Sequence, residues 1–168
     1  LTGVNTFSGV STVGAGLLVL GVDGALSNAG AVTVNGGELA LGLTSQTTGL
    51  VTLNGGRITG GILDGSGYEV RAGTLSSVLA GAGVLNKTMA GVVLIGGSNT
   101  FSGGVNLSQG VLQVSNDSAL GVGIFGLSGG TFSSDSGVAR SIANAWSLAG
   151  TLTFGDATNN GVLTFSGS

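Results

Sequence analysis

The sequence predicts an all-β chain that winds into a right-handed parallel β-helix, or β-solenoid. Three observations favour this fold. Thirty-six of the 168 residues are Gly and none is Pro, so the chain suits central strands joined by tight turns. Only 7% of the residues are charged, whereas the exposed faces of a helical domain are rich in Glu and Lys. Finally, a pattern of Gly followed by apolar residues recurs about every 19 residues.

The residue types that are missing exclude several functions. The chain has no Cys and no His, which excludes disulfides, thiol or imidazole catalysis and His- or Cys-based metal sites. Its four basic residues cannot form a phosphate-binding stripe, so nucleic acid is an unexpected partner. The net charge of −3 points to no electrostatic partner. No apolar run is long enough to predict a membrane span.

The repeat divides residues 1–168 into about eight coils of about 19 residues, each with three short strands, within one solenoid unit. Each coil has a turn glycine, and in most coils the residue before it is small. The turn glycines are Gly16, Gly37, Gly56, Gly73, Gly91, Gly110, Gly130 and Gly150. Two positions later stands an apolar residue, which we expect in a stacked core ladder: Leu18, Leu39, Ile58, Leu75, Val93, Leu112, Phe132 and Leu152. Differences in coil length fall in the variable third side of each coil.

The same alignment predicts side-chain pairs between neighbouring coils. Glu38 and Arg57 share an outward column and should form an ion pair, worth about 0.2–1 kcal/mol when exposed. Asn35 and Asn54 share a turn column and should form a short amide ladder. Trp146 and Tyr68 are expected to fill the interior of a coil, with a ligand-stacking platform as the alternative.

Several motifs carry a resemblance to a known family. The segment NTFSG occurs at residues 5–9 and again at residues 99–103, and the second copy lies between LNKTMAG and GVLQVSNDSALG. Residues 79–121 thereby resemble the autotransporter-associated β-strand repeat, also called the passenger-associated transport repeat. The resemblance implies a β-helical passenger region of a secreted or surface-displayed bacterial protein, commonly an adhesin. It implies no catalytic residues.

The acidic side chains and the outward columns bear on three other functions. A carbohydrate-active β-helix would need clustered carboxylates, and Asp117, Asp135 and Asp156 are the acids that fall in consecutive coils. These three could also form a shallow Ca²⁺ site, although turn capping by the Asp side chains is favoured. An ice-binding face would need Thr-x-Thr ladders, and only the last coils offer them.

The sequence as a whole predicts a structural shaft or display segment, without enzymatic activity and without a cofactor or metal. We expect it to be secreted or displayed on a bacterial surface, and to be a fragment of a longer repeat protein. The expected partners are adjacent coils of the same longer chain or end-to-end copies of itself, besides a host or cell-surface ligand. Unpaired strand edges at both ends would favour such pairing.

Overall fold

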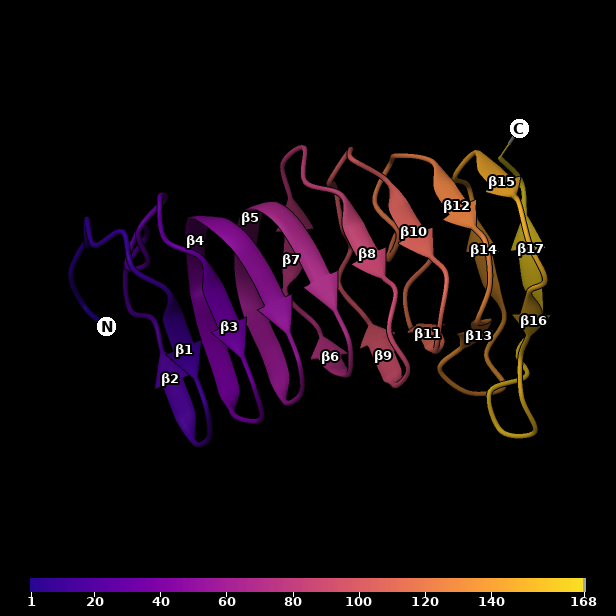
Figure 1. The fold of residues 1–168 in the computed structure, drawn as a ribbon, viewed down its shortest axis with the longest axis horizontal. Coiled ribbons are helices and arrows are strands. Elements are labelled where there is room, and N and C mark those ends of the chain that lie inside the picture. The colour runs from indigo at the N-terminus through magenta and orange to yellow at the C-terminus, as the bar shows by residue number, and fades with distance from the viewer. Residues whose placement is uncertain (168) are drawn as a thin grey trace.

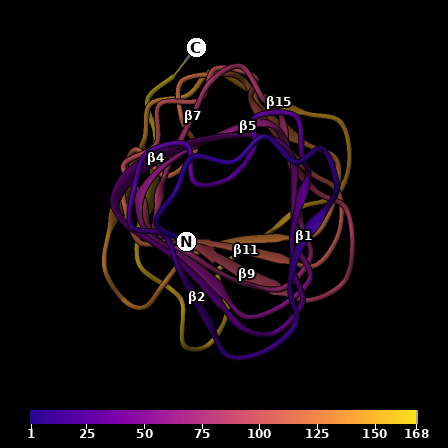
Figure 2. The same ribbon diagram turned by 90° about the vertical axis from the view of Figure 1, so that its left-hand side faces the viewer.

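The chain forms a rod of stacked coils, which a computed structural model describes for residues 1–167 (Figure 1). The two termini lie at opposite ends of the rod, and a view along its axis shows the coils as closed loops that overlie one another (Figure 2). Residues 1–167 contain strands and no helix, and every strand pair is parallel. The predicted β-solenoid of about eight coils is therefore confirmed.

The strands are short except for two in the N-terminal half. In chain order they are β1 (Ser11–Val13), β2 (Leu17–Val19), β3 (Val32–Val34), β4 (Glu38–Leu53), β5 (Arg57–Val70), β6 (Gly73–Leu75), β7 (Val78–Ala80), β8 (Leu85–Lys87), β9 (Val92–Ile95), β10 (Val105–Leu107), β11 (Val111–Val114), β12 (Phe125–Leu127), β13 (Thr131–Ser134), β14 (Arg140–Ile142), β15 (Trp146–Leu148), β16 (Thr153–Phe154) and β17 (Leu163–Phe165).

Two faces of the rod are continuous sheets, and the third side is strand in only some coils. One face runs through β1, β3, β4, β5, β8, β10, β12 and β15. The second runs through β2, β4, β5, β6, β9, β11, β13 and β16. The long strands β4 and β5 pass through the corners, so each contributes to more than one face. Within residues 1–167, strand pairs on the third side join β4, β5 and β7, and then β14 and β17, and no others.

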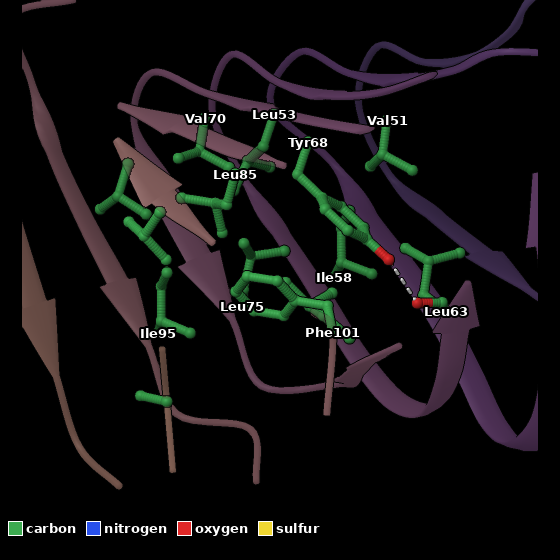
Figure 3. Packing of buried hydrophobic residues seen from close by; sticks show 14 of the residues in the cluster. Val51, Leu53, Ile58, Leu63, Tyr68, Val70, Leu75, Leu85, Ile95 and Phe101 are labelled. Atoms are coloured by element: carbon green, nitrogen blue, oxygen red, sulfur yellow. Dashed lines mark hydrogen bonds between the residues drawn. The ribbon is translucent and has the colours of Figure 1, made fainter. Parts of the chain in front are cut away.

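The interior is filled by side chains that stack on their counterparts in the next coil. Figure 3 shows Leu53, Val70 and Leu85 pointing into this space beside Leu75 and Ile95. A coil of this size cannot bury its own inner face, so the apolar area is removed from water only by stacking. Leu, Val and Ile dominate the buried set, which is what parallel sheets with a covered inner face require.

The predicted core ladder is in register over much of the rod, with two steps that differ. Leu18, Leu39, Ile58 and Leu75 pair in turn, and so do Val93, Leu112 and Phe132. The side chains from Leu39 to Phe132 in this set are fully buried, whereas Leu18 and Leu152 at the two ends are partly buried.

The first differing step lies between Leu75 and Val93. Leu75 pairs with Ile95, and Val93 pairs with Gly73. The cause is the length of the corner, which is four residues between β8 and β9 but two between β5 and β6. A shift of two residues keeps every side chain on its own side of the strand, so both Val93 and Ile95 stay buried.

The second differing step is at the C-terminal end of the ladder. Phe132 pairs with Phe154, so Leu152 lies outside the column that the alignment gave it. The corner between β15 and β16 is four residues, one longer than the corner between β12 and β13. The glycine spacing therefore locates the corners but does not fix the register that follows them.

Glycine is required at the corners for two physical reasons. Positive φ angles occur at most of the predicted turn glycines: Gly16 (73°), Gly56 (75°), Gly73 (115°), Gly91 (117°), Gly110 (74°) and Gly130 (87°). The other two, Gly37 and Gly150, need the absence of a Cβ instead. A Cβ on Gly37 would lie 2.6 Å from the carbonyl oxygen of Gly16, and one on Gly150 would lie 2.9 Å from the carbonyl carbon of Ser128.

We expect Gly56→Ala to lower the free energy of unfolding by about 2 kcal/mol. Gly56 has a positive φ, and a Cβ there would also lie 2.8 Å from the carbonyl carbon of Gly36. Gly14→Ala is the matched control, because a Cβ on Gly14 meets nothing within 4 Å. Urea unfolding of both variants measures the difference, and equal stabilities would contradict the assignment of a close backbone approach at this corner.

Candidate functional site

The predicted ion pair between coils is present on the second face. Arg57 Nη2 lies 2.7 Å from Glu38 Oε2, and the two residues stand opposite each other in the strand register. Thr59 donates a further hydrogen bond to the Glu38 carboxylate. The hydrogen bond from Arg57, and then that from Thr59, hold the pKa of Glu38 below its usual value. This pair and several corner glycines line an open hollow of about 620 Å³.

Amide ladders run along the outside of the rod. Asn54 Nδ2 donates to Asn35 Oδ1 at 2.8 Å, as predicted. A second ladder crosses three coils on the first face, where Asn106 donates to Asn86 and Asn86 donates to the carboxylate of Glu69. The alignment did not single out this ladder, although its members do share one column.

The acids that the sequence placed in consecutive coils each have hydrogen-bond partners of their own. Asp135 pairs with Arg140 of its own coil at 2.9 Å, and Asp117 accepts a hydrogen bond from the Ser141 backbone N–H. The carboxylate of Asp156 accepts hydrogen bonds from the side-chain amide of Asn159 and from the backbone N–H groups of Asn159 and Thr158, which cap its own turn and lower its pKa. Within residues 1–167, no three acids, His or Cys come close enough to hold a metal ion together. The three carboxylates thus have separate partners: Asp135 forms an ion pair, whereas Asp117 and Asp156 accept backbone hydrogen bonds.

Tyr68 fills the interior of its coil as expected, whereas Trp146 does not. The Tyr68 side chain is fully buried, and its hydroxyl group bonds with the Gly65 N–H and the carbonyl oxygen of Leu63 (Figure 3). Burial raises the pKa of this phenol. Trp146 stands over Phe125 in the register but is 45% exposed and packs against Phe165. Its strand, β15, pairs only with β12 in the described chain, so one side of the indole is uncovered.

The NTFSG motif places an amide between coils, a role that the sequence reasoning missed. Asn99 is buried; its Oδ1 accepts from the Leu79 N–H at 2.7 Å and its Nδ2 donates to the Ala119 carbonyl at 2.6 Å. The Asn of the first copy, Asn5, donates to the Ala25 carbonyl at 2.8 Å in the same way. The offset of 94 residues between Asn5 and Asn99 also separates Ala25 from Ala119, and this shared spacing was the available signal.

Lys87 is a second feature that the sequence reasoning missed. It occupies an inner column next to Leu107, and its side chain is fully buried. The ammonium group donates to the carbonyl oxygens of Met89 and Gln109, which belong to the corners of two neighbouring coils. No carboxylate in residues 1–167 forms a salt bridge with it, and burial lowers its pKa. The amine therefore holds corner carbonyls in place at an electrostatic cost.

The buried amine predicts a stability that rises with pH. Folding lowers the pKa of Lys87. At a pH between the pKa of the folded chain and that of the unfolded chain, the unfolded chain therefore binds more protons than the folded chain does. The free energy of unfolding should therefore increase as the pH rises through the lowered pKa of the folded amine toward about pH 10, where the unfolded amine titrates. The phenol of Tyr68, with its raised pKa, acts in the opposite direction only above this range.

Lys87→Met removes the titrating group and should flatten this slope, measured by urea unfolding across the same pH range. Arg71→Met is the control, because Arg71 is an exposed cation in the preceding coil. It should keep the slope of the unmodified chain. A slope that survives in Lys87→Met would show that another group causes it.

Comparison with known proteins gives one informative relative. Over 98 residues, which are 57% of this chain, the sequence is 34% identical to the adhesin BmaC autotransporter of Brucella suis biovar 1 (strain 1330). The chain spans 3% of the length of that protein. No family model and no solved structure matches the chain, so the resemblance to the named repeat rests on its motifs. The described residues include no helix able to cross a membrane. The chain is thus a β-solenoid that is similar, over more than half of its length, to a small part of an autotransporter adhesin.

Proposed function

We propose that this chain is a shaft segment of a secreted, surface-displayed bacterial protein of the adhesin kind, and that its role is structural rather than catalytic. The similarity to the BmaC autotransporter supports the surface setting. The shaft role rests chiefly on one observation, the unbroken strand pairing of the two continuous faces from β1 and β2 to β15 and β16.

These ladders give the rod its stiffness. Each coil is hydrogen-bonded to the coil before it and the coil after it, as in the chain of pairs from β8 through β10 to β12. Bending or stretching the rod would break several of these bonds and expose the stacked core at the same point. Polar bridges add further links between coils, among them the pair of Glu38 with Arg57.

Dye labels can test this stiffness, because the chain has no native Cys to interfere. Thr12 and Ser147 are exposed and stand in the same column of the first face, seven strand spacings apart. Cys substitutions at both positions should give one narrow single-molecule distance distribution centred at about 34 Å. A broad distribution, as a flexible chain would give, would contradict the shaft.

The surface role needs a separate measurement. Beads coated with the purified chain, and bacteria that display it, should show no attachment to host cells beyond that of a control solenoid, and no polysaccharide should be degraded. Attachment by the chain alone would instead assign it the binding function, and depolymerisation of a glycan would assign it an enzymatic one.

A further inference from the structure

The chain contains three Asn-Gly pairs, at residues 35–36, 54–55 and 160–161. In such a pair the backbone nitrogen of Gly can attack the side-chain amide of Asn, because Gly has no side chain that hinders the approach. All three pairs lie between strands, and Asn35 and Asn54 are each followed by Gly-Gly. The local sequence thus gives these two amides the same reactivity, and a difference between them must come from the fold.

Within the described chain, the attacking nitrogen is free at one of the three pairs. The Gly55 N–H donates to the carbonyl oxygen of Val34 at 3.4 Å, and the Gly161 N–H donates to that of Ser136 at 3.0 Å. The Gly36 N–H donates to no acceptor in residues 1–167. Gly36 is also exposed and lines the open hollow on the second face, so water has access to it. Because a hydrogen-bonded N–H must first give up its acceptor, Gly36 carries the available nucleophile.

The amide ladder between Asn54 and Asn35 acts on the two side chains in opposite ways. Asn54 Nδ2 donates to Asn35 Oδ1 at 2.8 Å, so it polarises the Asn35 amide and would stabilise the negative charge that develops on this oxygen during attack. In Asn54 the leaving nitrogen is itself held by the ladder, and Oδ1 is buried without a partner. A negative charge on that oxygen would be costly. The ladder therefore activates Asn35 and protects Asn54.

We propose that Asn35 is a site of spontaneous deamidation, and that the fold protects Asn54 and Asn160 from the same reaction. Water removes the proton from the Gly36 nitrogen, which forms a bond to Cγ of Asn35. The bond from Cγ to Nδ2 breaks, and the amide nitrogen takes up a proton and leaves as ammonia. Water then adds to either carbonyl group of the resulting cyclic imide and opens the ring to aspartate or isoaspartate. The net change exchanges ammonia for water, and nothing is oxidised or reduced.

The two products should affect the rod differently. Aspartate at this position keeps an oxygen that accepts from Asn54, so it should leave the coil intact while it adds one negative charge to the net charge of −3. Isoaspartate carries the main chain through the former side chain and so lengthens the corner by one atom. The coils approach closely at this corner, where a Cβ on Gly37 would lie 2.6 Å from the carbonyl oxygen of Gly16. Isoaspartate should therefore lower the melting temperature.

Peptide mapping by mass spectrometry tests the proposal on the purified chain, incubated in a mildly alkaline buffer with and without urea. In the folded chain, Asn35 should deamidate faster than Asn54 and Asn160 by about tenfold or more. In urea the fold no longer distinguishes the sites, so Asn35 and Asn54 should react at equal rates. Both aspartate and isoaspartate should form at position 35, and Asn35→Asp supplies the reference peptide. Asn35→Gln keeps an amide there but forms the larger ring slowly, so it should remove the product.

The proposal is overturned if Asn35 stays unchanged, or if Asn35 and Asn54 react at the same rate in the folded chain. Aspartate without isoaspartate would also overturn it, because direct hydrolysis by water, without attack by Gly36, gives aspartate alone. Melting of the isoaspartate fraction against Asn35→Asp gives an independent measurement. The isoaspartate fraction should melt at the lower temperature, and equal melting would contradict the close approach of the coils at this corner.

Discussion

Asn99→Leu should destabilise the rod more than any exposed substitution, by about 3–4 kcal/mol. Leu has the same branched arrangement of four side-chain heavy atoms as Asn and is the larger of the two, so the change leaves no cavity, but it removes both ends of a buried bridge. The Leu79 N–H and the Ala119 carbonyl, which belong to fully buried residues in the coils before and after, would then lack partners. Each buried group left unpaired costs about 1–3 kcal/mol.

Asn5→Leu is the matched control for this substitution. Asn5 holds the same place in the first NTFSG copy, but it is only half-buried, and its Oδ1 bonds with no described backbone N–H. Its replacement should cost about 1 kcal/mol. Urea unfolding of the two variants measures both values. Equal losses would mean that the exposed bond of Asn5 is worth as much as the buried bridge of Asn99, which would contradict the argument from burial.

The Asn99 bridge also explains why the motifs recur together. Asn99 donates to Ala119, and Phe101 of the same motif accepts a backbone hydrogen bond from Val122 just beyond Gly121. Gly121 has a positive φ, and a Cβ there would lie 3.0 Å from the ring of Phe101. NTFSG and the Ala-Leu pair one coil later, which Gly121 follows in the second copy and Ser27 in the first, are thus two halves of one packing unit that crosses between coils.

Side-chain pairs that depend only on column position could be predicted from the sequence. Glu38 and Arg57 pair, and so do Asn35 and Asn54, because the corner glycines of their coils are separated by 19 residues and the strands between are regular. In a parallel stack, residues in one column are neighbours about 4.8 Å apart whatever lies elsewhere. Periodicity was enough to determine these contacts.

Features that depend on corner length or on burial of a polar group could not be predicted in this way. The pairing of Leu75 with Ile95 follows from a corner two residues longer, and the glycine spacing does not report this length. Lys87 and Asn99 lie inside the rod, yet an alignment shows only a polar residue in an otherwise apolar column. To predict these two buried polar residues, one would have to know which backbone carbonyl and N–H groups of the adjacent coils lack partners, and the sequence does not contain this information directly.

Removal of one whole coil should leave a folded, shorter rod, because the strand register defines where the cuts must fall. Ile58 pairs with Leu75, so deletion of residues 58–74 joins Arg57 to Leu75 and places Leu39 over Leu75. On the first face, Val51 would then stand over Leu85, since Tyr68 now pairs with both. Every inner position keeps an apolar neighbour, and the pair of Glu38 with Arg57 survives. The rod should shorten by about 4.8 Å and retain a cooperative transition.

Deletion of residues 58–65 begins at the same bond but removes about half a coil, and it should abolish the cooperative transition. The remaining part of β5, with Tyr68 and Val70, could not reach its place between Leu53 and Lys87 and still connect to Arg57. The inner faces of the coils on both sides would lie open to water. Circular dichroism melting and small-angle scattering of the two deletions measure the contrast. If the half-coil deletion folded as well as the whole-coil deletion, stability would not come from the stacking of complete coils in register.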